Sequence, residues 1–149
     1  MKVSIIGTGY VGLTTGAVLA YLGHEVSCID TDHARIEQAR AGRCPFSEPH
    51  VAELLRLTGG RCRFTTSCEE GIPSAEVILV CVGTPSAPDG SPDLRSVFEA
   101  ARVIGAHMGS GYKVVANKST VPVGTAKRVQ SLIRETRLAG NGKAPAVSF

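Results

Sequence analysis

Short apolar runs and longer amphipathic segments alternate along this chain of 149 residues. Nearly continuous apolar runs are typical of parallel strands that are covered on both faces. The segments between them start at capping residues or end at glycines such as Gly23 and Gly42, which indicates helices. The expected strands are Lys2–Ile6, Glu25–Ile29, Cys62–Thr65, Val77–Val82, Lys113–Asn117 and the opening of a sixth at Val147–Phe149. The expected helices are Val11–Leu22, one capped by Asp32 and running to Arg40, His50–Leu57, Leu94–Met108 and Thr125–Leu138.

This alternation of strands and helices predicts the fold class. Connections of this kind form βαβ units, in which successive strands are parallel. The length suits one domain. A chain of this size buries roughly 70% of its unfolded surface, so it can fold without disulfide bonds or bound metals. We therefore expect an α/β protein with a Rossmann-type, doubly wound parallel sheet that forms a single domain over residues 1–149.

A glycine-rich hexamer follows the first expected strand and opens the first expected helix. Gly7 permits a tight turn, Gly9 lets a pyrophosphate approach the backbone, and Gly12 lets helix and strand pack closely. The free N–H groups at the helix start, around Tyr10 to Gly12, then face the anion. The context predicts a dinucleotide-binding loop, and the alternative is a tight turn that binds nothing.

An acidic residue closes the second strand at the spacing expected for a ribose-binding carboxylate. A carboxylate at Asp30 accepts from both ribose hydroxyls and repels a 2′-phosphate, which favours NAD over NADP. Its alternative role is to cap the next helix, but Asp32 is better placed for that. Arg35 lies one helical turn further on, where it either reaches the same ribose edge or is a solvated helix arginine.

Two later loops leave the same end of the sheet. Gly83–Pro85 follows the fourth strand and Lys118–Pro122 follows the fifth. In open α/β sheets ligands bind beyond the carboxyl ends of the strands. Thr84 and Thr120 are therefore candidates for contact with the nicotinamide half of the cofactor, and turn formation or helix capping is the alternative.

The chain resembles the UDP-glucose/GDP-mannose dehydrogenase family nearly end to end. Several linked segments in one order carry the resemblance, and together they are more specific than any one alone. They are Gly7–Leu13, Gly23–Val26 with Asp30, Gly42–Pro49, Val82–Ser86 with Asp93–Leu94, and Lys118–Gly124. The first of them is most similar to the UDP-glucose branch of the family.

The resemblance implies an enzyme that oxidises the C6 alcohol of UDP-glucose to UDP-glucuronate with two NAD⁺. Thr120 matches a threonine that helps to position a catalytic water, and Glu48 matches a glutamate near the cofactor. Arg35 stands where the family usually has lysine, and both donate to a ribose. The NAD contacts that the resemblance implies are Tyr10, Val11, Asp30, Arg35, Thr84 and Thr120.

The resemblance also implies parts that this chain lacks. In the family, a linking helix and a sugar-nucleotide domain follow, and that domain carries the nucleophilic cysteine. We therefore expect the isolated chain to bind NAD and to turn over nothing. We expect the full-length protein to bind its nucleotide-sugar substrate through the missing domain and to form a homodimer.

Composition and charge argue against several other kinds of protein. The net charge of +3 comes from scattered basic residues, which argues against nucleic-acid binding. The longest apolar run, Val77–Val82, is far too short to span a membrane, and we expect no secretory signal because the apolar stretch at the start is short and broken by glycines. The five cysteines are odd in number and include no CxxC pair, which argues against a disulfide framework and against a metal site. A reducing cytoplasm is the expected location.

Two further functions stay open. A free-standing NAD-binding module that senses or regulates without catalysis is compatible with the absent catalytic half. A domain that binds a flavin or a methyl donor is less compatible, because flavin sites usually have glutamate where this chain has Asp30.

Overall fold

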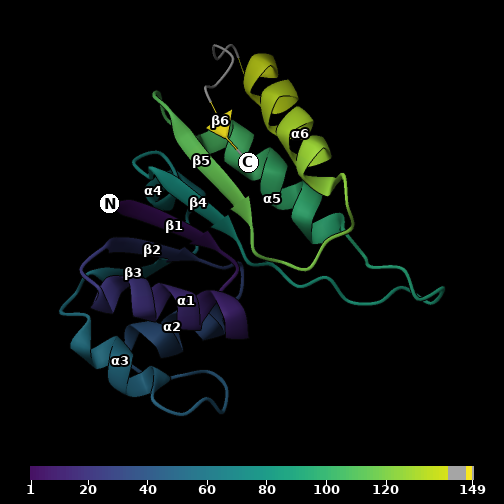
Figure 1. Cartoon of the computed structure of the whole chain (residues 1–149). Coiled ribbons are helices and arrows are strands. Elements are labelled where there is room, and N and C mark those ends of the chain that lie inside the picture. The colour runs from purple at the N-terminus through teal and green to yellow at the C-terminus, as the bar shows by residue number, and fades with distance from the viewer. Residues whose placement is uncertain (141–146, 149) are drawn as a thin grey trace.

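The computed structural model describes residues 1–140, 147 and 148, which form a parallel sheet with helices on both faces (Figure 1). The strand order is β3-β2-β1-β4-β5-β6, and every neighbouring pair is parallel. The order reverses between β1 and β4, which confirms the doubly wound prediction. The strands are β1 Lys2–Ile6, β2 Glu25–Ile29, β3 Cys62–Thr65, β4 Val77–Val80, β5 Lys113–Asn117 and β6 Val147–Ser148. The last predicted strand residue, Phe149, lies outside the described residues.

The helices divide between the two faces of the sheet. The first three cover the half formed by β1, β2 and β3, whereas α5 and α6 cover β4 and β5 from the other side (Figure 1). This division follows from right-handed crossovers that run first one way and then the other from β1. The helices are α1 Tyr10–Tyr21, α2 His33–Arg40, α3 Val51–Leu57, α4 Cys68–Gly71, α5 Arg95–His107 and α6 Thr125–Ala139.

Helix α1 contains no charged residue and packs closely on the sheet. Its buried positions are Gly12, Leu13, Gly16, Ala17 and Ala20. A Cβ on Gly16 would lie 2.6 Å from the sulfur of Cys28 in β2, so only glycine allows this approach. The first helix is thus held rigidly over β1 and β2, and its N-terminus is fixed at the carboxyl edge of the sheet.

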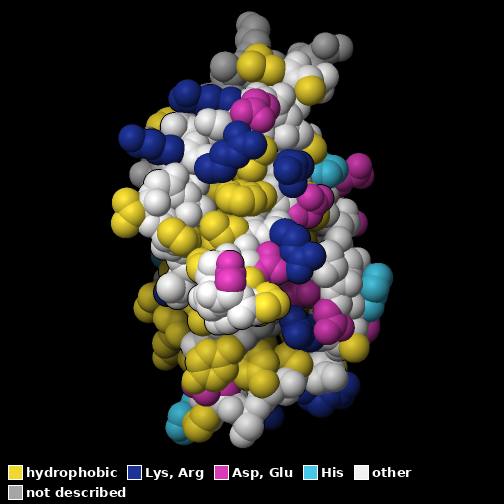
Figure 2. Space-filling model, turned by 90° about the vertical axis from the view of Figure 1, so that its right-hand side faces the viewer, with side chains coloured by type: hydrophobic (Ala, Val, Ile, Leu, Met, Phe, Trp, Pro, Cys, Tyr) yellow, Lys and Arg dark blue, Asp and Glu magenta, His cyan; other side chains and the backbone are white. Residues whose placement is uncertain are grey.

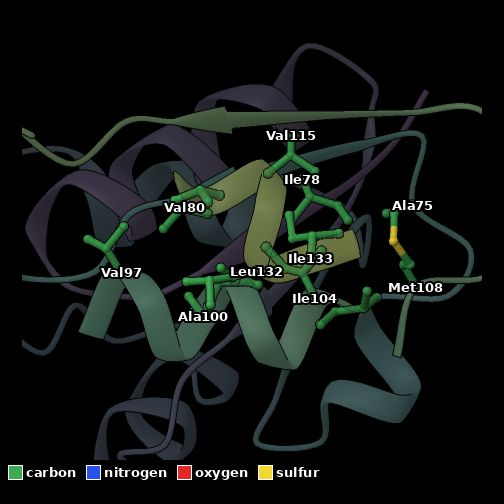
Figure 3. Close-up of a cluster of buried hydrophobic side chains, with 14 of the residues drawn as sticks. Ala75, Ile78, Val80, Val97, Ala100, Ile104, Met108, Val115, Leu132 and Ile133 are labelled. Carbon is green, nitrogen blue, oxygen red and sulfur yellow. The ribbon is translucent and has the colours of Figure 1, made fainter. Parts of the chain in front are cut away.

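Two layers of apolar side chains hold the sheet between its helices. The layer under α5 and α6 combines strand residues with helix residues and is shown in Figure 3. The layer under α1 includes Cys28, Cys62 and Cys81, whose thiols are core groups. All five cysteines are free. Of the first layer, Figure 3 labels Ala75, Ile78, Val80, Val97, Ala100, Ile104, Met108, Val115, Leu132 and Ile133.

The predicted capping residues mark the start of α2 and the ends of α1 and α2. The Asp32 carboxylate accepts hydrogen bonds from the N–H groups of Ala34 and Arg35 at 2.9 and 3.1 Å, which caps α2. Gly23 and Gly42 adopt φ of 96° and 68° just after α1 and α2. In this region a residue with a Cβ is strained, so glycine closes both helices at low cost.

Two elements differ from the prediction. The strand expected over Val77–Val82 ends at Val80, whose carbonyl accepts from the N–H groups of both Lys118 and Ser119 at 2.8 and 3.0 Å. The chain then turns out of the sheet. The short helix α4 was missed, since four residues are too few to show helical periodicity. Ser67 caps it by accepting from the N–H of Glu70 at 3.3 Å.

A glycine inside α5 yields a prediction for the contact between α5 and α6. A Cβ on Gly105 would lie 2.7 Å from the carbonyl oxygen of Ile133, which is backbone and cannot swing aside. Gly105→Ala should therefore lower the free energy of unfolding by about 1–3 kcal/mol, despite a gain of about 1 kcal/mol in helix propensity. Urea denaturation measures the change.

The control for this prediction is Gly83→Ala. A Cβ at Gly83 meets no atom within 4 Å, and its backbone is not left-handed. This variant should change the free energy of unfolding by less than about 0.5 kcal/mol. Equal stability of both variants would show that α5 and α6 do not need the close approach.

Candidate functional site

A cleft of about 1140 Å³ opens at the carboxyl edge of the sheet, between the ends of β1 and β4. Figure 2 views this edge, where acidic and basic side chains lie interspersed above a group of hydrophobic ones. One wall contains the glycine loop and the residues after β2, and the other is the start of α5. The lining residues include Gly7, Gly9, Asp30, Thr31, Arg35, Thr66, Cys81, Gly83, Pro85, Asp93, Arg95, Phe98 and Arg102.

The backbone of the glycine loop packs against itself and against β4. Gly7 has φ of 95°, and a Cβ there would lie 2.7 Å from the carbonyl oxygen of Cys81. A Cβ on Gly12 would lie 1.9 Å from the carbonyl oxygen of Gly7. A Cβ on Gly9, by contrast, would meet no atom within 4 Å. Gly7 and Gly12 are therefore required by packing, and Gly9 keeps a space open beside the loop.

The first turn of α1 carries no side-chain cap. Its N-cap residue is Gly9, which has no side chain to accept a hydrogen bond, and no acidic residue lies in the first turn. Of the other helices that begin after a strand, α2 is capped by Asp32 and α4 by Ser67, whereas α5 and α6 also have no side-chain cap. The unpaired N–H groups and the positive end of the helix dipole at α1 are thus available to an anion.

Asp30 connects the end of β2 to the glycine loop. Its Oδ2 accepts from the N–H and the hydroxyl of Thr8 at 2.7 and 2.9 Å. Its Oδ1 accepts from the N–H of Asp32 at 2.9 Å. The side chain is only 9% exposed but lines the cleft. A carboxylate has about four acceptor positions, so these three donors leave room for a hydroxyl donor from a ligand.

The environment keeps Asp30 ionised. Burial alone raises the pKa of its carboxyl, but hydrogen bonds from Asp32 and Thr8 and the charge of Arg35 outweigh burial and lower the pKa below its ordinary value. The group therefore presents a negative charge to the cleft at neutral pH. Such a charge favours neutral hydroxyl donors and disfavours anions.

Arg35 lies beside Asp30 at the same edge of the sheet. Its Nη1 is 3.6 Å from Oδ2 of Asp30, and its Nε is 3.3 Å from Oδ2 of Asp32. It lines the cleft, although its side chain is 47% exposed.

Tyr10, the first residue of α1, is fixed by the loop that precedes α3. Its ring centroid lies 5.5 Å from that of Phe46, at an interplanar angle of 40°. A hydrogen bond with Glu48, followed by the negative charge of that carboxylate, raises the pKa of the Tyr10 hydroxyl. The segment Gly42–Pro49 singled out in the sequence is thereby joined to the glycine loop, with Glu48 as the polar contact.

The remaining predicted contacts lie at the edge but outside the cleft. Thr84 and Thr120 follow β4 and β5, and Thr120 is exposed. Val11 is 45% exposed at the start of α1. These three residues, like Tyr10 and Gly12, are not among those that line the cleft.

Sequence reasoning missed two parts of the site. Thr8 is buried and donates twice to Asp30, and its position between two glycines of the loop is the signal that could have identified it. The α5 wall, with Arg95 and Phe98, comes into the cleft only through the tertiary fold. Arg95 is held by the Asp93 carboxylate at 2.5 Å and lowers the pKa of Asp93 to about 2.

No helix in the described part of the chain is long and apolar enough to cross a membrane. Within residues 1–140, 147 and 148, no group of three or more His, Cys, Asp or Glu side chains is arranged to hold a metal ion.

Comparison with known proteins identifies relatives of the whole chain. The UDP-glucose 6-dehydrogenase of Pseudomonas aeruginosa is 45% identical over 136 residues, which are 90% of this chain and 30% of that protein. A UDP-glucose 6-dehydrogenase of Bacillus subtilis is 44% identical over 137 residues, 91% of this chain and 31% of that protein. The chain thus spans about a third of the length of these relatives.

Two solved structures of dehydrogenases are also similar to this chain. A ternary complex of the GDP-mannose dehydrogenase of Pseudomonas aeruginosa has a TM-score of 0.91 and 32% identity, and the match covers 99% of this chain and 35% of that one. The UDP-glucose dehydrogenase of Pyrobaculum islandicum has a TM-score of 0.88 and 39% identity, covering 95% and 33%.

The family model for the NAD binding domain of the UDP-glucose/GDP-mannose dehydrogenases matches residues 1–147. This match confirms NAD as the cofactor and agrees with the resemblance seen in the sequence. The chain therefore belongs to the UDP-glucose/GDP-mannose dehydrogenase family, of which it is an NAD-binding domain.

Proposed function

We propose that this chain is the NAD-binding part of a dehydrogenase that oxidises the C6 alcohol of UDP-glucose to the carboxylate of UDP-glucuronate. The uncapped first turn of α1, facing the same edge as the ionised Asp30, is the observation that supports cofactor binding. The names of the relatives that are 45% and 44% identical support UDP-glucose as the substrate.

The residues present fit a dinucleotide. The N–H groups of Tyr10, Val11 and Gly12 would hold the pyrophosphate, with Gly9 leaving space for it. Asp30 would accept from the adenosine ribose, and Arg35 would donate at the same edge. Thr84 and Thr120 would contact the nicotinamide half, and Thr120 would also orient a catalytic water through its hydroxyl. Bound NAD⁺ supplies the hydride acceptor.

The overall reaction sets what the rest of the protein must provide. Oxidation of an alcohol to a carboxylate removes two hydrides, which reduce two NAD⁺, while water supplies the second oxygen and three protons are released. The substrate pocket and the nucleophile would lie in the two thirds of the relatives' length that this chain does not cover.

The assignment extends to the organisation of the protein. Residues 1–149 would form the cofactor domain, followed by a linking helix and a sugar-nucleotide domain, in a cytoplasmic homodimer. The isolated chain would bind NAD and be inactive. Relatives three times as long and named as dehydrogenases favour this reading over a free-standing sensor.

Cofactor binding is tested by titrating the 149-residue chain with NAD⁺ and NADP⁺ in a calorimeter. We expect NAD⁺ to bind, and NADP⁺ to bind at least about tenfold more weakly, because Asp30 repels a 2′-phosphate. The same sample should not reduce NAD⁺ when UDP-glucose is added. A folded sample that binds neither dinucleotide would contradict the proposed cofactor site.

The glycine loop gives a second prediction that separates binding from folding. In Gly9→Ala, the new Cβ occupies the open space beside the loop, so the Kd for NAD⁺ should rise at least about tenfold. The free energy of unfolding should fall by less than about 1 kcal/mol, since Gly9 has an ordinary φ of −68°.

Gly12→Ala is the contrasting variant for this prediction. Its Cβ would lie 1.9 Å from the carbonyl oxygen of Gly7, so both stability and NAD⁺ binding should be lost. If Gly9→Ala binds NAD⁺ like the parent, the pyrophosphate does not approach the loop at this point.

Asp30→Asn tests the ribose contact without removing all acceptors. Alanine would leave the three donors from Thr8 and Asp32 unpaired, whereas asparagine keeps one carbonyl oxygen. The Kd for NAD⁺ should rise about tenfold, the size of a hydrogen bond to a charged group, and the Kd for NADP⁺ should rise less. Titration of the folded variant with both dinucleotides gives the ratio, and an unchanged ratio counts against the ribose role.

A further inference from the structure

Two carboxylates share one guanidinium at the cleft entrance. Arg35 lies 3.6 Å from Asp30 through Nη1 and 3.3 Å from Asp32 through Nε. With all three side chains ionised, the group carries one net negative charge. Asp30 is 9% exposed, whereas Asp32 and Arg35 are 42% and 47% exposed. The triad therefore faces solvent on the side of Asp32 and the cleft on the side of Asp30.

Asp32 does not itself line the cleft, although Asp30, Thr31 and Arg35 do. One of its oxygens, Oδ1, is occupied by the N–H groups at the start of α2. Its other oxygen, Oδ2, holds the Nε of Arg35. The helix cap needs only Oδ1, so the contact with Arg35 is a separate use of this side chain.

The position of Arg35 gives that contact a consequence for cofactor choice. An arginine at the end of the second strand accommodates the 2′-phosphate of NADP when its donors are free. A 2′-phosphate carries roughly −1.5 to −2 charges. Here Asp30 and Asp32 engage two of the donor nitrogens and outnumber the guanidinium in charge.

We propose that Asp32 is a specificity-determining positioning residue, which disfavours NADP by engaging the Nε of Arg35, so that this donor is not free to meet a 2′-phosphate on the adenosine ribose. The inference rests on the proposed cofactor site and adds to it a residue that touches no part of the ligand. Asp30 would accept directly from a hydroxyl of the adenosine ribose, whereas Asp32 acts through Arg35. Without the Asp32 charge, the Nε of Arg35 is free and the pair of Asp30 and Arg35 is neutral overall.

The test compares Kd values for NAD⁺ and NADP⁺ between the parent chain and two variants, Asp32→Asn and Asp32→Ser. Both replacements are good N-caps, so α2 is retained and each variant checks the other. We expect the ratio of the NADP⁺ Kd to the NAD⁺ Kd to fall about fivefold, the size of one exposed charge interaction. The Kd for NAD⁺ itself should change by less than about twofold. The fall should shrink in 0.5 M salt, because the Asp32 side of the triad is exposed to screening.

A matched control lies on the same helix. Glu37 pairs with Arg40 at 2.7 Å and does not contact Arg35, so Glu37→Gln removes an equal charge from α2. This variant should leave the ratio unchanged. In the Arg35→Ala background, Asp32→Asn should also leave the ratio unchanged, because the route through the guanidinium is gone.

The possible outcomes distinguish a failure of the inference about Asp32 from a failure of the proposed function. A ratio that stays within about twofold of the parent in folded Asp32 variants overturns the inference, while NAD⁺ binding by the parent preserves the proposed function. A parallel loss of NAD⁺ and NADP⁺ binding makes Asp32 a structural residue only and overturns the inference as well. A full effect in the Arg35→Ala background overturns the route through Arg35. Failure of the parent chain to bind NAD⁺ overturns the proposed function itself.

Discussion

The contact between the backbones of Gly7 and Gly12 fixes where everything else at the cleft can lie. With 1.9 Å between the carbonyl oxygen of Gly7 and any Cβ at position 12, the first turn of α1 touches the strand end directly. No side chain fits between them, and Gly9 at the N-cap supplies none. The first N–H groups of α1 therefore have no side-chain cap, at the edge of the sheet where the cleft opens. The proposed anion site thus follows from a packing constraint, with no charged residue in the loop.

The rigidity of that site comes from apolar packing on both faces of the sheet. Helix α1 has no charged side chain and is anchored through Gly16 and Leu13, while α5 and α6 close the opposite face. Polar groups are left for the carboxyl edge, where Asp30, Thr8 and Arg35 meet. A site built on strand ends between two packed layers is positioned more exactly than one built on a long loop.

Features governed by neighbours in the sequence could be predicted, and features governed by distant contacts could not. The cap at Asp32 and the helix ends at Gly23 and Gly42 follow from local backbone chemistry, as does the glycine loop. The end of β4 did not follow in this way, because the apolar run continues to Val82 although the strand stops at Val80, where the chain contacts Lys118 and Ser119 nearly forty residues later.

The same distinction applies to the site. Of the predicted cofactor contacts, Gly7, Gly9, Asp30 and Arg35 line the cleft, whereas Tyr10, Val11, Gly12, Thr84 and Thr120 do not. The α5 wall did not follow from any motif, because Phe98 and Arg95 reach the cleft only when α5 packs across the sheet. Asp30 shows why a motif residue is hard to interpret from sequence alone. Three of its roughly four acceptor positions serve Thr8 and Asp32, so the carboxylate that we propose for the ribose also holds the loop that we propose for the pyrophosphate. Ligand recognition and local folding thus depend on one side chain, and its charge matters to both.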